Sequence, residues 1–308
     1  MTTELIVTAL ISAFGPMLWW YKDGHRVTPD GKTLLGYVGG RTPVNPFHTR
    51  VGLIWLFRLV PKWREVTIDG DTVKCQQSLV KVWFGLSMAC VSLSALFLGM
   101  RYGPIAATLF VLSPWARNMV SWYTTQTDQP ALVLGTLALL LSPEVGNPTN
   151  PAWVALVCAI GALFHERVPV LAAVWTWNPY CLVGLLPYLV LRLLIKPGSS
   201  MSHEAEIVDK PWQSARKASN QFPLYYHIVP LGLFWLGALG SIQCALAVGL
   251  AYAQCLVAWD RVRLYSWAIP FLLPGTIAVL ATLEPGVAVL LSAGCLVAMH
   301  SVAERLKY

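Results

Sequence analysis

The sequence predicts an all-α protein, a polytopic transmembrane bundle of about nine to eleven helices, some of them short or re-entrant. Two observations carry this prediction. Of the 308 residues, 56% are hydrophobic and only 12% are charged, whereas roughly 25% of the residues in a soluble domain are charged. The apolar residues also gather in runs whose ends carry tryptophans and tyrosines, as at the two interfaces of a bilayer. We therefore expect an integral, multi-pass protein of the plasma or inner membrane, with residues 1–308 forming one transmembrane domain.

The apolar runs define the expected helices in order. Leu5–Trp20 predicts the first helix and Val82–Met100 is the clearest span. The remaining runs are shorter or interrupted, and they are Pro104–Val120, Gln129–Leu141, Pro151–Phe164, Val168–Trp177, Tyr180–Ile195, Leu224–Trp259, Trp267–Thr282 and Val287–Ala303. Asn178-Pro179 predicts a break. Gly237 and Gly240 predict a reversal inside the longest of these runs, because it exceeds one ordinary crossing.

Several of these helices are too short to cross a bilayer alone. Broken helices are tolerated in a membrane only where protein or a water-filled cavity covers the freed backbone groups. The short, proline-bearing segments therefore indicate an internal cavity. A tilted bundle in a locally thinned bilayer is the alternative.

Two long polar loops interrupt the apolar pattern, at residues 21–81 and 197–223. In the first loop, the amphipathic insert Val51–Val60 predicts a helix that lies in the membrane interface. Ile68–Thr72 in the same loop has the composition of a turn. In the second loop, His203–Lys217 mixes charges and predicts a surface helix.

Several classes of site are missing from the sequence. Most of the seven cysteines lie in apolar runs, without CxxC pairs, and this favours small buried hydrophobes over a disulfide or zinc framework. No HxxxH pattern occurs, and Asp69-Gly70-Asp71 is a single DxD inside a predicted turn rather than part of a cluster, so we predict no metal ligands. No cofactor is certain, although a divalent metal stays open. No Walker loop or GxSxG motif supports a nucleotide-driven pump or a serine hydrolase. Anionic lipid explains the net charge of +7 more simply than nucleic acid, which we do not expect as a partner.

Two acids in the first loop are candidate catalytic bases. Asp23 follows the first apolar run in the sequence Tyr21-Lys22-Asp23-Gly24. There it would lie at the membrane surface and could act as general base toward a hydroxyl nucleophile. A solvated acid at a helix end is the alternative. Asp30 lies in Thr28-Pro29-Asp30-Gly31, a turn signature, and is the second candidate.

Four further residues are candidate substrate-binding groups near the middle of the chain. Asp128 precedes an apolar run, where helix capping and the helix dipole explain it equally well. The triplet His165-Glu166-Arg167 separates two apolar runs. Charge is costly in and beside hydrocarbon, so these residues are functional candidates. An interfacial turn whose charges reach outward to water is the alternative for the triplet.

The last candidates, Asp260, Arg261 and Arg263, close a long apolar stretch. In a helix, Asp260 and Arg263 share one face. The planar guanidinium of arginine donates paired hydrogen bonds to phosphate. We therefore predict a phosphate site here, with a basic cluster that only touches headgroups as the alternative.

The order of these motifs resembles the GT-C superfamily of integral-membrane glycosyltransferases, which use polyprenyl-phosphate-linked sugars. The resemblance is carried by short segments from the first helix to Pro274. They are Tyr21–Gly24, Pro46–Val51, Ser113-Pro114 with Thr127–Pro130, Gly161–Arg167, and Asp260–Leu264 with Pro270.

The resemblance implies a division of roles among the candidates. Asp23 would be the catalytic carboxylate, and Arg261 or Arg263 would bind the phosphate of the polyprenyl-phosphate-sugar donor. Glu166 and Asp128 would line the acceptor or donor cavity. The carboxylate would deprotonate the acceptor hydroxyl, which displaces polyprenyl phosphate from the anomeric carbon with inversion, while arginine stabilises the leaving phosphate. A carrier, flippase or binding subunit for a lipid-linked sugar is the alternative, since it needs the arginines and no base.

Overall fold

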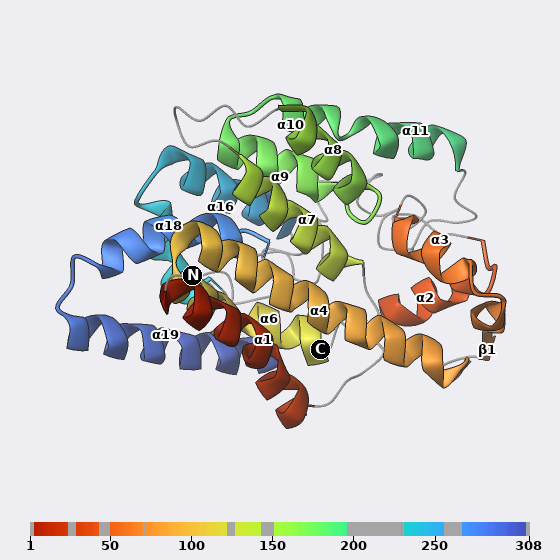
Figure 1. Ribbon diagram of the computed structural model, residues 1–308, viewed down its shortest axis with the longest axis horizontal. Coiled ribbons are helices and arrows are strands. Elements are labelled where there is room, and N and C mark those ends of the chain that lie inside the picture. Colours follow the sequence, from red (N-terminus) through yellow and green to blue (C-terminus); the bar gives the residue numbers. More distant parts are fainter. Residues whose placement is uncertain are drawn as a thin grey trace, which may run out of the picture.

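The computed structural model describes residues 3–23, 29–42, 50–69, 72–121, 127–142, 151–195, 229, 231–255 and 267–305. Within these ranges the chain is almost wholly helical, and its sole sheet has two short strands. The all-α prediction is therefore confirmed. Figure 1 shows the helices as a layered bundle with the small sheet projecting at one end.

Four helices form the first part of the bundle: α1 (Thr3–Asp23), α4 (Gln77–Tyr102), α5 (Pro104–Leu112) and α6 (Pro114–Ser121). α1 packs against the other three. The first predicted helix and the clearest predicted span are confirmed as helices, but both are longer than expected. Tyr21, Lys22 and Asp23, which the sequence placed after the helix, form the end of α1.

The predicted helix Pro104–Val120 is wrong in one respect, because the structure breaks it at Ser113. Pro114 has no N–H to continue the helical hydrogen bonds. The hydroxyl and the N–H of Ser113 instead donate to the Phe110 carbonyl, at 2.6 and 3.1 Å. The chain therefore turns between α5 and α6, and the whole of α6 is buried.

The segment that the sequence predicted as the first polar loop contains helices and strands. It forms α2 (Pro29–Val38) and α3 (Gly52–Arg58), then a 3-10 turn, η2 (Pro61–Arg64). Asp30 was predicted in a turn, and this is wrong, because it lies in the first turn of α2. Proline at the first helical position and an acid beside it both favour a helix N-terminus.

The predicted interfacial helix is confirmed as a helix by α3. Leu53, Ile54 and Phe57 face the core, whereas Trp55 and Leu56 are exposed. Beyond it, β1 (Thr67–Asp69) and β2 (Thr72–Lys74) pair antiparallel, with Asp69 opposite Thr72. The chain therefore reverses where the sequence predicted a turn.

The middle of the chain forms α7 (Asp128–Leu141), α8 (Pro151–Ala162), α9 (Arg167–Thr176), α10 (Tyr180–Val183) and α11 (Leu186–Leu194). Trp177 has a left-handed backbone, φ 52°, directly before Asn178-Pro179, so the predicted break there is confirmed. The helical run predicted over Tyr180–Ile195 is confirmed over Tyr180–Leu194, although a turn at Gly184-Leu185 divides it into α10 and α11.

The C-terminal part forms η3 (Gly232–Phe234), α15 (Trp235–Ala238), α16 (Ile242–Cys255), α18 (Ile269–Leu280) and α19 (Pro285–Arg305). A turn at Leu239-Gly240 separates α15 from α16, so the long predicted run is interrupted near Gly237 and Gly240. A Cβ on Gly237 would collide with the Leu272 carbonyl of α18, so glycine lets α15 and α18 approach closely. The surface helix predicted over His203–Lys217 lies outside the described residues.

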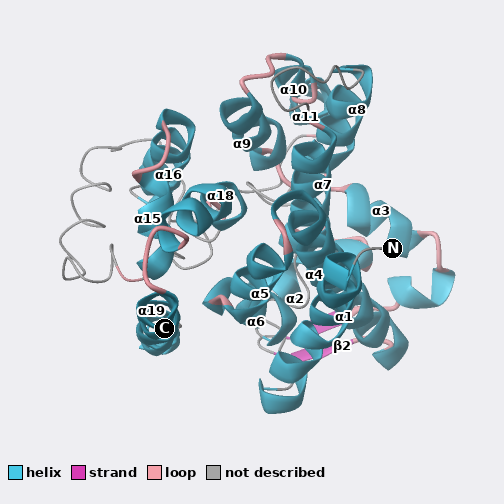
Figure 2. Cartoon of the chain, turned by 60° about the vertical axis from the view of Figure 1, so that its left-hand side comes forward, coloured by secondary structure: helices cyan, strands magenta, loops and turns pink. Residues whose placement is uncertain are grey.

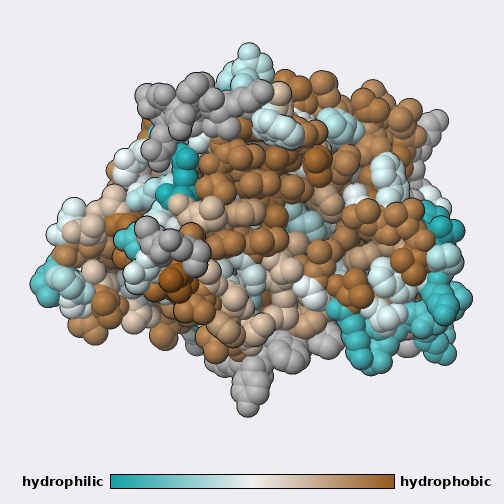
Figure 3. All heavy atoms as spheres, in the orientation of Figure 1, coloured by the Kyte–Doolittle hydropathy of each residue, from teal (hydrophilic) through white to brown (hydrophobic). Residues whose placement is uncertain are grey.

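Two of the described helices are long and apolar enough to cross a membrane: α4, over Gln77–Tyr102, and α19, over Pro285–Ala303. The other apolar helices in the described ranges are shorter. Figure 3 shows that apolar residues dominate one face of the molecule, with hydrophilic residues gathered at the end that carries β1. In Figure 2, α15, α16, α18 and α19 form one side and α1, α4 and α7 the other; α18 packs against α4 and α5 between them.

Candidate functional site

The candidate site begins with a buried carboxylate at the start of α7. Asp128 is fully buried, and its Oδ1 accepts a hydrogen bond of 3.3 Å from the Trp267 indole N–H. The same oxygen lies 3.8 Å from Nε2 of His165. The His165 and Trp267 rings are in contact, with centroids 5.0 Å apart. Asp128 therefore contacts residues that precede α18 and follow α8, rather than only its own helix.

His165 connects this carboxylate to a second one. Nδ1 of His165 accepts a hydrogen bond of 3.3 Å from the backbone N–H of Arg167 and lies 3.5 Å from Oε2 of Glu166. Because Nδ1 acts as acceptor, the neutral ring carries its proton on Nε2, the nitrogen that faces Asp128. The imidazole thus lies between a buried acid and a partly exposed one.

Glu166 is held by an arginine from the first polar loop. Nε and Nη2 of Arg50 donate to its two carboxylate oxygens at 3.3 and 3.0 Å. The Arg50 side chain is 6% exposed and that of Glu166 28% exposed. A bidentate pair of this kind is both strong and geometrically specific. It fixes the segment before α3 to the turn between α8 and α9, and the Gly52 N–H donates to the Leu163 carbonyl beside it.

The charges around this turn shift two pKa values. Burial lowers the pKa of His165 well below its usual range, and the Arg50 charge lowers it further. Burial alone would raise the pKa of Glu166, but Arg50, followed by His165 and Arg167, outweighs burial and holds it below its usual range. At neutral pH, His165 is therefore neutral and Glu166 is ionised.

Further buried polar groups of α6 and its neighbours surround Asp128. Trp115 contacts Trp267, with ring centroids 6.4 Å apart, and the Gln129 amide donates to the Met119 carbonyl at 3.1 Å. Within the described ranges, three buried atoms here lack a hydrogen-bond partner: Nε1 of Trp115, Oδ1 of Asn118 and Oγ1 of Thr127. Buried polar groups are usually hydrogen-bonded, so these atoms are candidates for contact with a polar ligand or water.

The structure brings together four of the predicted site residues. Asp128, His165 and Glu166 form the cluster, and Arg167 joins it through its backbone N–H. The alternative, an interfacial turn whose side chains reach outward to water, does not hold for His165, whose side chain is 2% exposed.

For the remaining predicted site residues, the structure gives at most the position of the backbone. Asp23 is the last residue of α1, and Asp30 is the second residue of α2; nothing further is described for their side chains. Asp260, Arg261 and Arg263 lie outside the described residues. The chain resumes at Trp267, which donates to Asp128.

The sequence analysis did not select Arg50 and Trp267 as site residues. Arg50 belongs to the Pro46–Val51 segment, beside an amphipathic run. An arginine at the boundary of an apolar run is the sequence signal that could have identified it as a site residue. Trp267 looked like one more interfacial aromatic. No spacing rule links Arg50 to Glu166, because 116 positions separate them.

Among the described residues, no group of three or more histidine, cysteine, aspartate or glutamate side chains is arranged to hold a metal ion. The six cysteines described are all free thiols. No family model, no curated protein and no solved structure matches this chain.

Proposed function

We propose that the chain is a multi-pass membrane glycosyltransferase of the GT-C type, which moves a sugar from a polyprenyl-phosphate donor to an acceptor hydroxyl. One observation carries the proposal: three segments far apart in the sequence meet in the cluster of Arg50, Asp128, His165 and Glu166 at one end of the apolar helices. A fully buried carboxylate beside hydrocarbon is costly, and such groups are retained for function by default.

The position of α1 supports a role for Asp23 at the same end. Trp19, one turn before Asp23, donates from its indole N–H to the Val111 carbonyl at 2.7 Å, and Val111 lies at the end of α5, next to α6. α6 is joined in turn to α7 by the hydrogen bond from Gln129 to Met119. The end of α1 and the start of α7 therefore both neighbour α6.

In the proposed mechanism, Asp23 accepts the proton of the acceptor hydroxyl as its oxygen attacks the anomeric carbon of the donor sugar. The bond from that carbon to the polyprenyl phosphate oxygen breaks, and the phosphate leaves with the electron pair. Arg261 or Arg263 stabilises the charge on that phosphate. Asp128, fixed by Trp267 and His165, orients the sugar hydroxyls through its carboxylate oxygens, which accept hydrogen bonds.

The test uses the full chain reconstituted in liposomes with radiolabelled polyprenyl-phosphate hexoses, supplied one at a time. Asp23→Asn is expected to lower transfer at least 100-fold, as removal of a general base does, and to leave donor binding intact. Asp69→Asn, on the exposed hairpin, is the matched control and should keep full transfer. Transfer that survives Asp23→Asn would remove Asp23 from the mechanism.

A carrier or flippase for a lipid-linked sugar is the second candidate. The observation that favours it is a pair of apolar grooves on the bundle surface, of about 460 and 380 Å³, which suit lipid chains without any chemistry. The same liposomes discriminate between the two. In a carrier, the labelled lipid would move between leaflets without sugar transfer from any of the donors. Asp23→Asn would leave this movement unchanged, and that result would establish the carrier function instead.

A further inference from the structure

Between the core and the hairpin, α3 and η2 form an exposed corner, residues 55–64, which we call the α3–η2 corner. The core-facing residues of α3 are buried. On the other face, Trp55, Leu56 and Leu59 are 48%, 56% and 73% exposed. Large apolar side chains that gather on one exposed surface mark an interaction site. The corner is therefore a candidate contact surface outside the Asp128 cluster.

The α3–η2 corner is fixed to the rest of the molecule by aromatic packing. The Phe57 ring meets Trp63 of η2 edge-on, with centroids 5.5 Å apart, and meets Trp83 of α4 with centroids 4.8 Å apart. The Trp63 indole N–H donates to the Ser78 hydroxyl of α4 at 3.1 Å. The exposed side chains therefore stand on a fixed base at the start of α4.

The start of α4 is one end of a helix that is long and apolar enough to cross a membrane. With 26 residues and a rise of about 1.5 Å per residue, α4 exceeds the roughly 30 Å of the hydrocarbon core, so its ends reach the headgroups. Figure 1 shows α3 and the hairpin at the same end of α4. In the membrane arrangement proposed above, the corner thus lies at headgroup depth, where tryptophan is favoured.

The α3–η2 corner and the residue after it also carry a surplus of positive charge. Arg58, Lys62 and Arg64 are exposed, whereas Glu65 is the one acid between Arg58 and Glu65. Nε of Arg64 donates to the Arg58 carbonyl at 2.6 Å, which closes η2 back onto α3. Exposed apolar side chains with lysine and arginine beside them are typical of segments that bind an anionic bilayer surface.

We propose that the α3–η2 corner docks into the headgroup layer and gathers anionic phospholipid around it. Trp55, Leu56 and Leu59 reach the acyl boundary of the bilayer. Arg58 and Lys62 attract the net negative charge of the headgroups, and not the phosphate as such, which zwitterionic phospholipids also carry. The inference rests on the membrane placement in the proposed function and does not depend on sugar transfer.

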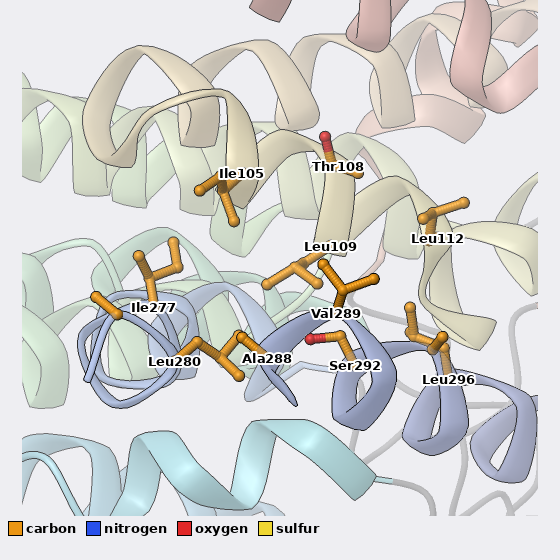
Figure 4. Close-up of a pocket in the computed structure, with 12 residues that line it drawn as sticks. Ile105, Thr108, Leu109, Leu112, Ile277, Leu280, Ala288, Val289, Ser292 and Leu296 are labelled. Atoms are coloured by element: carbon orange, nitrogen blue, oxygen red, sulfur yellow. The ribbon is translucent and has the colours of Figure 1, made fainter. Parts of the chain in front are cut away.

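The groove between α5, α18 and α19 supplies an internal reference, because it is apolar and far simpler in charge. Figure 4 shows Ile105, Leu280 and Val289 around the space between the three helices, and the lining residues that it draws are all uncharged. Val289 is 67% exposed and belongs to α19, the other helix long enough to cross. A lipid beside Val289 meets no cation among these residues, so its headgroup should match the bulk composition.

The experiment introduces the photo-crosslinking amino acid p-benzoylphenylalanine at position 59 or position 289 of the full chain. The protein is reconstituted in liposomes of equimolar dioleoyl phosphatidylglycerol and dioleoyl phosphatidylcholine, irradiated, and its adducts are identified by mass. Position 59 is expected to capture about fivefold more phosphatidylglycerol than phosphatidylcholine, the factor that one lysine or arginine contributes at an anionic surface. Position 289 should capture the two lipids equally.

Arg58→Gln combined with Lys62→Gln should return the ratio at position 59 to that of the bulk bilayer, while lipid adducts persist because the apolar side chains remain. Arg64 is left in place, since it closes the corner. Arg192→Gln, on the exposed part of α11, removes a cation elsewhere and should keep the fivefold ratio. Salt at about 1 M, where the screening length is about 3 Å, should lower the ratio without any variant.

Four results would contradict the account. Equal capture of the two lipids at position 59 would remove the charge recognition, and a fivefold ratio that survives the double variant would assign it to other groups. Capture of a second copy of the chain at position 59, or no capture there, while position 289 still captures lipid, would give the corner to a protein contact or to water. Lipid capture at neither position would instead overturn the membrane placement in the proposed function.

Discussion

Arg50 and Arg117 are almost equally buried, at 5% and 6% exposure, yet their surroundings differ in kind. Arg50 meets a carboxylate, Glu166, through two hydrogen bonds. Arg117 meets an imidazole nitrogen and the face of an indole, which carry no negative charge. Arg50 therefore joins two distant segments of the candidate site through a charged pair, whereas Arg117 joins α6 to α1 and α19 through ring contacts.

The largest expected effect of this difference is on stability. Arg50→Gln leaves the Glu166 carboxylate half-buried beside His165 without its bidentate partner, and should lower the free energy of unfolding by about 3 kcal/mol. Arg117→Gln removes a cation–π contact and one long hydrogen bond, so about 1 kcal/mol is expected. Thermal unfolding in one lipid-free detergent measures both variants. Equal losses of unfolding free energy would show that the two arginines contribute equally to stability, which would contradict this comparison.

An effect of intermediate size is expected from acid. The pKa of His165 is lowered by burial from its ordinary 6.5, so below pH 6.5 the unfolded chain takes up a proton that the folded chain refuses. Stability should fall by up to about 1.4 kcal/mol per pH unit there. Glu166, with its depressed pKa, adds a further loss below its ordinary 4.5. The charged neighbours of His165 are Arg50, Asp128, Glu166 and Arg167.

His165→Gln is the control for the acid experiment, because it removes the titrating ring but keeps a hydrogen-bonding side chain. Unfolding curves between pH 7 and pH 5 should become flatter in this variant. An unchanged slope would mean that another group controls the acid response.

The smallest expected effect concerns Trp267. Trp267→Phe keeps an aromatic ring against His165 and Trp115 but removes the N–H that donates to Asp128. Loss of this 3.3 Å hydrogen bond should lower the free energy of unfolding by about 1 kcal/mol. Chemical denaturation measures the loss, and Trp115→Phe is a matched control, since its Nε1 has no hydrogen-bond partner among the described residues. Equal losses in the two variants would reduce the role of Trp267 to packing.

Local features of the fold were predictable from the sequence, since the helical runs, the Asn178-Pro179 break and the interruption near Gly240 are set by neighbouring residues. The errors have local causes too. Pro29, at the start of α2, was interpreted as part of a turn, although proline is also favoured at the first position of a helix. Asp128 and the residues from His165 to Arg167 were found because charge is rare in apolar runs. The pairs that join them, Arg50 with Glu166 and Trp267 with Asp128, depend on tertiary contacts that no local pattern encodes.

The central claim is that the acids needed for transfer share one membrane face with the buried cluster. Figure 1 places the hairpin and the link between α18 and α19 at opposite ends of the molecule. The decisive measurement labels Asp23→Cys, Asp69→Cys and Glu284→Cys with a membrane-impermeant maleimide, in sealed vesicles of both orientations, and reads each site by peptide mass. The account predicts labelling of positions 23 and 69 from one side and of position 284 from the other. Labelling of positions 23 and 69 from opposite sides would contradict it.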